Sequence, residues 1–309
     1  MAEFFIGVDG GGTGCRAAIA DVNGVFLGQG CGGPANIVTN LEGALVNIRT
    51  AIDAAFAQAG LEQVHYARSH AFLGLAGANI AGAGTAIAQA MPFAHTEVES
   101  DGLIALQGAL GDQDGVVVIL GTGTAYIIRN EGKIRFIGGW GFPLSDLGSG
   151  ARLGQSLLQE CLLVHDGIHP GSPLISALLN EFDNKPDNLV EFGRKAVPAD
   201  YGRYAPRIFD YAQRGDLTAL MLLKRSVAYV GETLDMLILQ GVERISLLGG
   251  MARFYREYLP DHQQKLLVEP AADGLTGAVQ LVLKRFLSSP CPKSQHGTVF
   301  DPMTERTAQ

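Results

Sequence analysis

The sequence contains no pair of cysteines close enough to form a CxxC motif, since its four cysteines are Cys15, Cys31, Cys161 and Cys291. This spacing excludes a zinc ribbon, a thioredoxin-like redox site and a local iron–sulfur loop. Isolated cysteines are typical of small core residues in a reduced compartment, so we expect a cytoplasmic protein. The first residues, MAE, lack the basic segment that opens a secretory signal peptide.

A basic excess is also absent. The chain has 23 Lys and Arg against 31 Asp and Glu, a net charge of −8. Nucleic acid is therefore not an expected partner. The P-loop motif GxxxxGK[ST] does not occur. A bound phosphate would accordingly be held mainly by backbone N–H groups and a metal ion.

A long uninterrupted apolar run is missing as well. Residues 69–96 carry no Asp, Glu, Lys or Arg, but glycines, Asn79, Gln89 and Pro92 interrupt them. A membrane-spanning helix needs about 20 predominantly apolar residues. We therefore expect no membrane association.

Glycine, in contrast, is abundant, with 41 of 309 residues against an average usage of roughly 7 %. Many of these glycines belong to a repeated unit. An apolar strand, residues 4–9, runs into Gly10-Gly11-Gly12-Thr13, a second strand (15–20), the turn Asn23-Gly24 and a third strand. The same order returns 111 residues later, with strands at 116–120, 125–129 and 133–137 and the glycine turn at 121–124. Two copies predict two similar domains that each open with a β-meander.

The rest of the chain alternates between helical and extended patterns. Apolar residues from Leu41 to Phe56 follow the i, i+3, i+4 spacing of an amphipathic helix. Strands are predicted at 70–76, 95–99 and 244–248, and helices at 85–90, 101–110, 149–165, 173–182, 187–196, 203–214, 216–240 and 276–286. This predicts an α/β fold, in which ligands bind at the carboxyl ends of the strands, between the halves.

The glycine turns are the first candidate binding elements. Without side chains, their backbone N–H groups can surround an anion. Asp9, directly before the first turn, can hold Mg²⁺, most simply through water. The alternative is that the turn is only a strained hairpin. A GxGxxG match at Gly28, Gly30 and Gly33 lies after a third meander strand, which argues against a dinucleotide site there.

Three further residues carry candidate chemistry. Asp101 stands where a strand meets a helix, and can either accept a proton from an attacking hydroxyl or simply cap the helix. Trp140, the only tryptophan, lies among glycines in GGWG and can face a sugar or fill the core in a tight bend. Asp146 can bind a hydroxyl or cap the following helix with Ser149.

These motifs together resemble a known family. VDGGGT at the start, LGTGT after the second meander's first strand, GGWGFPLSDLGSGARLG and LLGGMA near the end are similar to those of the BadF/BadG/BcrA/BcrD ATPase family. That family belongs to the actin/hexokinase/Hsp70 ATPase superfamily, and within it the chain most resembles N-acetylglucosamine and glucosamine kinases. The resemblance covers about residues 4–287.

The resemblance implies two ribonuclease H-like domains with a hinged cleft. The expected domains are residues 1–112 and 113–275, with helix 276–287 packed on the first and 288–309 as an extension. It also implies site residues at matching positions. They are, for the phosphates, Gly11, Gly12, Thr13 and Thr122; for the rest of the nucleotide, Ala212, Gly249 and Gly250; for the sugar, Asn36, Asp101, Thr124, Gly139, Trp140, Gly141 and Asp146; and for Mg²⁺, Asp9.

The predicted function is ATP- and Mg²⁺-dependent phosphorylation of N-acetylglucosamine or glucosamine at the 6-hydroxyl, giving the 6-phosphate and ADP, with Asp101 as the base. We expect a homodimer. Two alternatives stay open: an electron-transferring ATPase activator of a dehydratase or reductase, and a non-catalytic actin-like protein that binds sugar or nucleotide. The activators carry cysteines for a cluster shared across a dimer, and none of the four cysteines here lies in such a motif.

Overall fold

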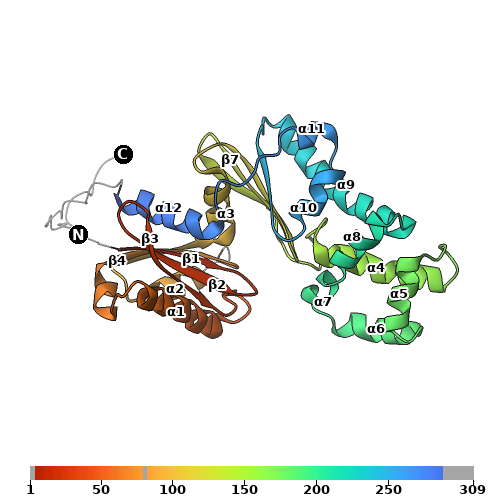
Figure 1. Ribbon diagram of the computed structural model, residues 1–309, viewed down its shortest axis with the longest axis horizontal. Helices are drawn as coiled ribbons and strands as arrows, with labels where there is room; N and C mark the ends of the chain where they lie inside the picture. Colours follow the sequence, from red (N-terminus) through yellow and green to blue (C-terminus); the bar gives the residue numbers. More distant parts are fainter. Residues whose placement is uncertain (1–3, 79–81, 288–309) are drawn as a thin grey trace, which may run out of the picture.

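The computed structural model describes residues 4–78 and 82–287, and the predicted extension 288–309 lies outside them. The chain forms two lobes, each built on one β-sheet (Figure 1). None of the described helices combines the length and the apolar character that a membrane crossing needs.

The first lobe contains a five-stranded sheet in the order β3-β2-β1-β4-β5. Its meander is antiparallel, while β1, β4 and β5 run parallel. The elements are β1 (Phe4–Gly10), β2 (Cys15–Ala20), β3 (Phe26–Gly32), α1 (Leu41–Gln58), η1 (Gln63–Arg68), β4 (Ser69–Leu75), α2 (Ala83–Ala90), β5 (His95–Ser100) and α3 (Asp101–Leu110).

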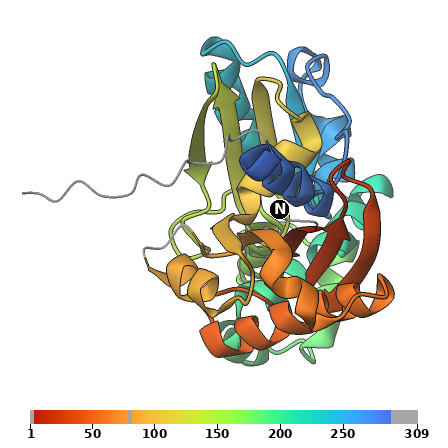
Figure 2. The same ribbon diagram turned by 90° about the vertical axis from the view of Figure 1, so that its left-hand side faces the viewer.

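Alternate residues of β1 and β4 face opposite layers of helices. Ile6 and Val8 pack with Ile48 and Ile52 of α1, whereas Phe5, on the other face, packs against the last helix, α12 (Gly274–Leu287). Gly7 permits this approach, because a Cβ there would lie 2.7 Å from Cγ2 of Val279. Figure 2 shows the sheet between α12 above and α1 and α2 below. The end of the chain therefore completes the core of its first lobe.

The second lobe contains a four-stranded sheet in the order β8-β7-β6-β9. The strands are β6 (Gly115–Leu120), β7 (Thr124–Asn130), β8 (Lys133–Gly138) and β9 (Ile245–Leu248). The helices are α4 (Gly150–His165), α5 (Pro173–Glu181), α6 (Pro186–Lys195), α7 (Pro198–Gly202), α8 (Ala205–Gln213), α9 (Leu217–Leu239), α10 (Ala252–Tyr255), η2 (Arg256–Tyr258) and α11 (Asp261–Gln264). The predicted helices and strands occur, with bounds within about two residues.

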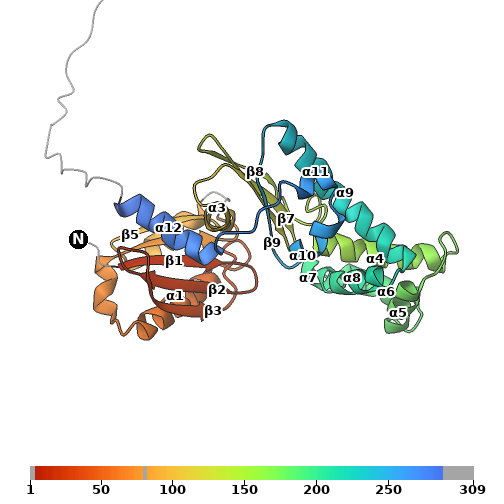
Figure 3. The same cartoon turned by 45° about the horizontal axis from the view of Figure 1, so that its top comes forward.

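Helix α3 lies between the two sheets (Figure 3). Its Ile104 belongs to the cluster that α12 forms with the first sheet. Its Leu106 and Leu110 pack with Val117 and Ile127 of the second sheet. The residue that begins this helix, Asp101, is consequently placed where the lobes meet.

Candidate active site

The carboxyl ends of the first sheet's parallel strands meet in one row. Gly10 of β1 pairs with Leu75 of β4, and Leu75 pairs with Ser100 of β5. The glycine turn after β1 and Asp101 after β5 therefore leave the sheet at the same edge. The segment that carries Asn36 joins them, because the N–H of Ala35 donates to the carbonyl of Gly11 at 2.9 Å.

The side-chain amide of Asn36 is hydrogen-bonded within its own loop through its oxygen only. Its Oδ1 accepts hydrogen bonds from the N–H groups of Val38 (3.0 Å) and Thr39 (3.1 Å). Its Nδ2 has no hydrogen-bond partner within residues 4–78 and 82–287. The loop thus orients an amide whose donors remain available to a ligand.

Some glycines of the turns have no internal reason to be glycine. A Cβ added at Gly12, Gly121 or Gly250 would meet nothing within 4 Å, and none of the three has a positive φ. Neither strain nor crowding inside the protein therefore requires glycine there. Close approach of a ligand to the backbone is one physical reason that fits glycine at all three positions. Gly11 differs in that its N–H donates to the carbonyl of Gly14 at 2.9 Å, which closes the turn.

Asp9 takes part in an ion-pair chain that the sequence analysis did not anticipate. Its Oδ2 accepts from Nη2 of Arg16 at 2.6 Å, and Nη1 of Arg16 donates to Oδ2 of Asp273 at 2.7 Å. Asp273 also accepts from the N–H of Thr276 at 3.0 Å, at the start of α12. Arg16 thereby connects β1, through Asp9, to the start of the last helix, through Asp273.

Asp101 is the first residue of α3, and Ser100 is its N-cap. The Oδ1 of Asp101 accepts from the N–H of Gly102 at 2.9 Å and from the Ser100 hydroxyl at 3.3 Å. Burial raises the pKa of the Asp101 carboxyl, the negative charge of Asp9 raises it further, and the two hydrogen bonds oppose the shift. Asp101 is therefore not the N-cap of α3, because Ser100 occupies that position.

The second sheet places two buried polar side chains at its corresponding edge. Thr124 is 3 % exposed and Asp146 is 9 % exposed. Within the described residues, neither Oγ1 of Thr124 nor Oδ1 of Asp146 has a hydrogen-bond partner. Burying an unpaired polar atom costs about 1–3 kcal/mol.

Asp146 is held in an unusual conformation. Its φ is +60°, a region that costs a non-glycine residue energy. Burial raises the pKa of its carboxyl, while the backbone N–H groups of Thr124 and Gly141 and the charge of Arg152 lower it. Such strain is often found at binding sites.

The loop between β8 and α4 carries the remaining predicted sugar residues. Gly139 has a φ of +70°, Gly141 has a φ of +98°, and the N–H of Gly139 donates to the carbonyl of Thr124 at 3.0 Å. Trp140 is 82 % exposed, so it is not a core tryptophan. The loop therefore brings Gly139 next to Thr124 and presents Trp140 to solvent.

A pocket of about 300 Å³ opens beside the second glycine turn. Thr122 and Gly250 line it together with Met251 and two aromatic residues, Phe209 and Phe254. The aromatic rings stack with centroids 4.1 Å apart. Sequence reasoning missed both phenylalanines, because they come from different segments and match no motif.

Two nucleotide predictions fit the pocket less directly. Ala212 lies on α8 and is 5 % exposed, but the residues that α8 contributes to the pocket are Ala205, Pro206 and Phe209. Gly249 has a φ of +96°, and a Cβ there would lie 2.4 Å from the carbonyl oxygen of Leu120. Gly249 is therefore required by the backbone itself.

The weak GxGxxG match has a structural explanation. A Cβ at Gly28 would lie 2.3 Å from the carbonyl oxygen of Ala55, and one at Gly30 would lie 2.1 Å from that of Ala51. Both glycines let α1 pack closely on β3, and this packing accounts for glycine at the two positions.

Duplicated sheets of this topology, with glycine turns at matching edges, define the actin-like ATPase fold. The chain belongs to the BadF/BadG/BcrA/BcrD ATPase family, whose model matches residues 6–282. It is 38 % identical over 283 residues to the glucosamine kinase GspK of Vibrio cholerae, covering 91 % of this chain and 96 % of that protein.

Solved structures agree with this assignment. A Chromobacterium violaceum protein provisionally named an N-acetylglucosamine kinase is 33 % identical, with a TM-score of 0.83, covering 91 % of this chain and 99 % of that one. A glucokinase of the ROK family from Streptomyces griseus, solved with glucose and AMPPNP, is 19 % identical with a TM-score of 0.55, covering 93 % and 100 %. The latter likeness concerns the fold alone.

Proposed function

We propose that the protein is an ATP- and Mg²⁺-dependent kinase that phosphorylates the 6-hydroxyl of glucosamine or N-acetylglucosamine. The observation that carries the proposal is the place of Asp101, a carboxylate of raised pKa at the meeting of the two lobes, beside Asp9 and the first glycine turn. The names of the relatives, a glucosamine kinase and an N-acetylglucosamine kinase, indicate the class of sugar.

In the proposed reaction, the sugar O6 attacks the γ-phosphorus of ATP. The new O6–P bond forms as the bond between γ-phosphorus and the β–γ bridging oxygen breaks, and ADP leaves. Asp101 accepts the proton of the 6-hydroxyl. A pKa raised toward the working pH makes a carboxylate a better base. The backbone N–H groups at Gly12 and Thr13 stabilise the charge that develops on the phosphoryl oxygens.

We propose further roles for the remaining residues. Asn36, Thr124 and Asp146 would bind sugar hydroxyls, with Gly139, Trp140 and Gly141 forming the wall beside them. Thr122 and Gly250 would contact the nucleotide, with its base in the pocket of Phe209 and Phe254. Gly11, Gly249 and Ala212 would support these contacts through the backbone.

Asp9 suits Mg²⁺, which is commonly bound through one or two carboxylates plus substrate phosphates. The described residues contain no group of three or more metal-binding side chains. When bound, Mg²⁺ would neutralise charge on the phosphates. Asp9 would hold it beside the turn while Arg16 keeps the carboxylate oriented.

A coupled assay with glucosamine, N-acetylglucosamine and glucose tests the activity. We expect ATP consumption that depends on an amino sugar, and phosphorus NMR of the product should show a 6-phosphate. ATP hydrolysis that is unchanged by any of these sugars would contradict the proposal and favour an activator or an actin-like protein.

We also propose the domain division 1–112 and 113–275, with 276–287 joined to the first domain, a homodimer, and a cytoplasmic location. The surface proposed for the dimer is the start of α9, where Leu217 (80 % exposed) and Met221 (36 % exposed) lie one helical turn apart. Light scattering of the wild type should give twice the mass of one chain. The location is supported by the thiols of Cys15, Cys31 and Cys161, which are not joined in disulfides.

A further inference from the structure

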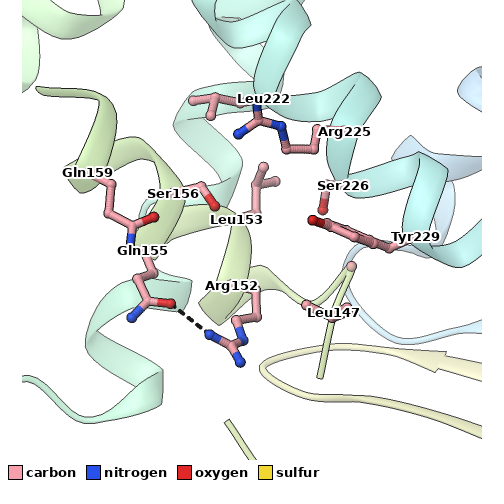
Figure 4. Close-up of a pocket in the computed structure, with 11 residues that line it drawn as sticks. Leu147, Arg152, Leu153, Gln155, Ser156, Gln159, Leu222, Arg225, Ser226 and Tyr229 are labelled. Carbon is pink, nitrogen blue, oxygen red and sulfur yellow. Dashed lines mark hydrogen bonds between the residues drawn. The ribbon is translucent and has the colours of Figure 1, made fainter. Parts of the chain in front are cut away.

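A second pocket, of about 220 Å³, lies between α4 and α9. It is lined by none of the side chains to which the proposed reaction gives a role. Pockets that hold drug-sized ligands are about 300–1,000 Å³, so the space suits a smaller ligand. Figure 4 shows Ser156 and Gln159 of α4 and Arg225 and Tyr229 of α9 around it, with Arg152 at the end near Leu147.

The charge of this pocket is opposite to that of the whole chain. The chain has a net charge of −8. The pocket's 11 lining residues, all within the described part of the chain, include Arg152 and Arg225 but no Asp or Glu. The two guanidinium groups lie at opposite ends of the pocket, and neither has an acidic neighbour in the lining, so each can attract an anion.

The two arginines have donors to offer. Arg225 makes no hydrogen bond or ion pair with another residue of 4–78 or 82–287. Arg152 donates to the carbonyls of Ser145 (3.0 Å) and Pro143 (3.3 Å) and to Oε1 of Gln155 (3.0 Å). A guanidinium has five N–H donors, so Arg152 keeps two more.

Hydroxyl and amide groups complete the set. Ser156 and Tyr229 bring hydroxyls, and Gln159 brings an amide, from the two helices that form the walls. The planar fork of arginine matches a phosphate group with two parallel N–H···O bonds, and neutral donors fill the remaining oxygens. We propose that this pocket binds a small anion that carries a phosphate group, either inorganic phosphate or the monoester of a small metabolite.

The pocket shares a wall with the loop of the active site. Leu147 and Gly148 line it and directly follow Asp146. The carbonyl of Gly148 is also fixed from behind by the hydroxyl of Tyr255, at 2.7 Å. Arg152 holds the loop by donating to the carbonyl of Ser145, and its positive charge lowers the pKa of Asp146.

Occupation of the pocket therefore acts on sugar binding. An anion in the pocket screens the positive charge of Arg152 that acts on Asp146. This step rests on the proposed function, in which Asp146 binds the sugar. We expect phosphate to raise the KM for the sugar severalfold and to leave kcat little changed.

Binding is tested first, without any use of activity. Inorganic phosphate is titrated by calorimetry into protein saturated with sugar and a non-hydrolysable ATP analogue, at constant ionic strength. The variant is Arg225→Gln, and the matched control is Lys224→Gln, the same loss of charge one residue earlier and outside the pocket. We expect one phosphate site in the wild type and in Lys224→Gln, weakened about tenfold or more in Arg225→Gln.

Equal phosphate affinity in Arg225→Gln and Lys224→Gln would overturn the proposal, as would no binding by the wild type. A second titration, with glucosamine 6-phosphate, identifies the source of the phosphate group. Tighter binding than inorganic phosphate, again lost in Arg225→Gln, indicates a monoester, and weaker binding indicates free phosphate.

The kinetic arm then measures the KM for the sugar with and without phosphate. A rise in the wild type and in Lys224→Gln but not in Arg225→Gln supports the coupling. If the calorimetry shows the site but no sugar is phosphorylated, the proposed function fails while the anion site stands. If the sugar is phosphorylated and no phosphate binds, the anion site fails while the proposed function stands.

Discussion

The surroundings of Gly12 and Gly249 differ in whether they leave room for a side chain. At Gly249 the backbone has a φ of +96°, and the carbonyl oxygen of Leu120 would lie 2.4 Å from a Cβ. At Gly12 a Cβ would meet nothing within 4 Å. The same substitution at the two positions therefore separates ligand binding from folding.

We predict that Gly12→Ala leaves the stability within about 0.5 kcal/mol of the wild type, as is usual for surface positions. Its KM for ATP should rise at least about tenfold, because the added methyl group occupies the space of a phosphate. Urea unfolding and steady-state kinetics measure the two effects. The control, Gly249→Ala, should lose about 1–2 kcal/mol or more through the left-handed backbone alone. An unchanged KM for ATP in Gly12→Ala would remove the phosphate role of this turn.

We predict that Asp101→Asn lowers kcat by about 10²–10⁴-fold, the usual contribution of a general base. It should also stabilise the protein at pH 7. The folded-state pKa of Asp101 is raised, so ionisation of this carboxyl destabilises the folded protein. The destabilisation is absent below the unfolded-state pKa of about 3.9. It is complete above the folded-state pKa.

Melting temperatures of wild type and Asp101→Asn, compared from pH 3.5 to pH 8, check the second effect. The variant should be more stable at neutral pH, and the difference should shrink as the pH falls. Activity within tenfold of the wild type would show that Asp101 is not the base.

Helices α3 and α12 cross at a distance that only glycine permits. A Cβ at Gly277 would lie 2.0 Å from the carbonyl oxygen of Ile104, and one at Gly108 would lie 2.1 Å from that of Asp273. This crossing fixes both the helix that begins at Asp101 and the carboxylate that pairs with Arg16.

We predict that Gly277→Ala destabilises the protein by about 1–3 kcal/mol, the usual effect of overpacking. Gly193→Ala is the matched control. It is also a helical glycine, but its Cβ would lie 3.7 Å from the hydroxyl of Tyr201, an ordinary contact. Gly193→Ala should stabilise by about 0.4–1 kcal/mol, because alanine narrows the unfolded ensemble. Chemical unfolding measures the change in the free energy of unfolding for both variants. Changes of the same sign would refute the argument that α3 and α12 cross too closely for a side chain at Gly277.

The elements were predictable from the sequence where their signals were local. The apolar period of residues 41–56 predicts α1, and the strand-to-helix junction at Asp101 predicts α3. The contacts that complete the site were not predictable. Arg16 and Asp273 are 257 residues apart, and Phe209 and Phe254 meet only because α8 and α10 pack together. A periodic pattern within one segment carries no information about such distant pairs, so they could be identified only from the three-dimensional structure.

At the scale of the whole molecule, the two halves of the candidate site lie on different sheets. Asn36 and Asp101 belong to the edge of the first sheet, and Thr124 and Asp146 to that of the second. A sugar that touches both sets should draw the lobes together and exclude water.

The single tryptophan, Trp140, offers a test of this expected closure. Trp140 is 82 % exposed, and we predict that saturating amino sugar with a non-hydrolysable ATP analogue shifts its fluorescence emission to shorter wavelength. Asp146→Asn should bind the sugar more weakly and shift the titration to higher concentration. Emission that stays constant while calorimetry shows both ligands bound would contradict closure over Trp140.

The place of α12 has a consequence for how the chain is made. Phe5 and Phe72 are covered by a helix that begins only at Gly274. Synthesis proceeds at about 5–20 residues per second, so one face of the first sheet waits roughly 10–40 s on the ribosome for its cover. Any nascent chain that stops before α12 carries that apolar face into the cell unprotected, and premature termination in the second lobe should yield aggregates instead of a folded first lobe.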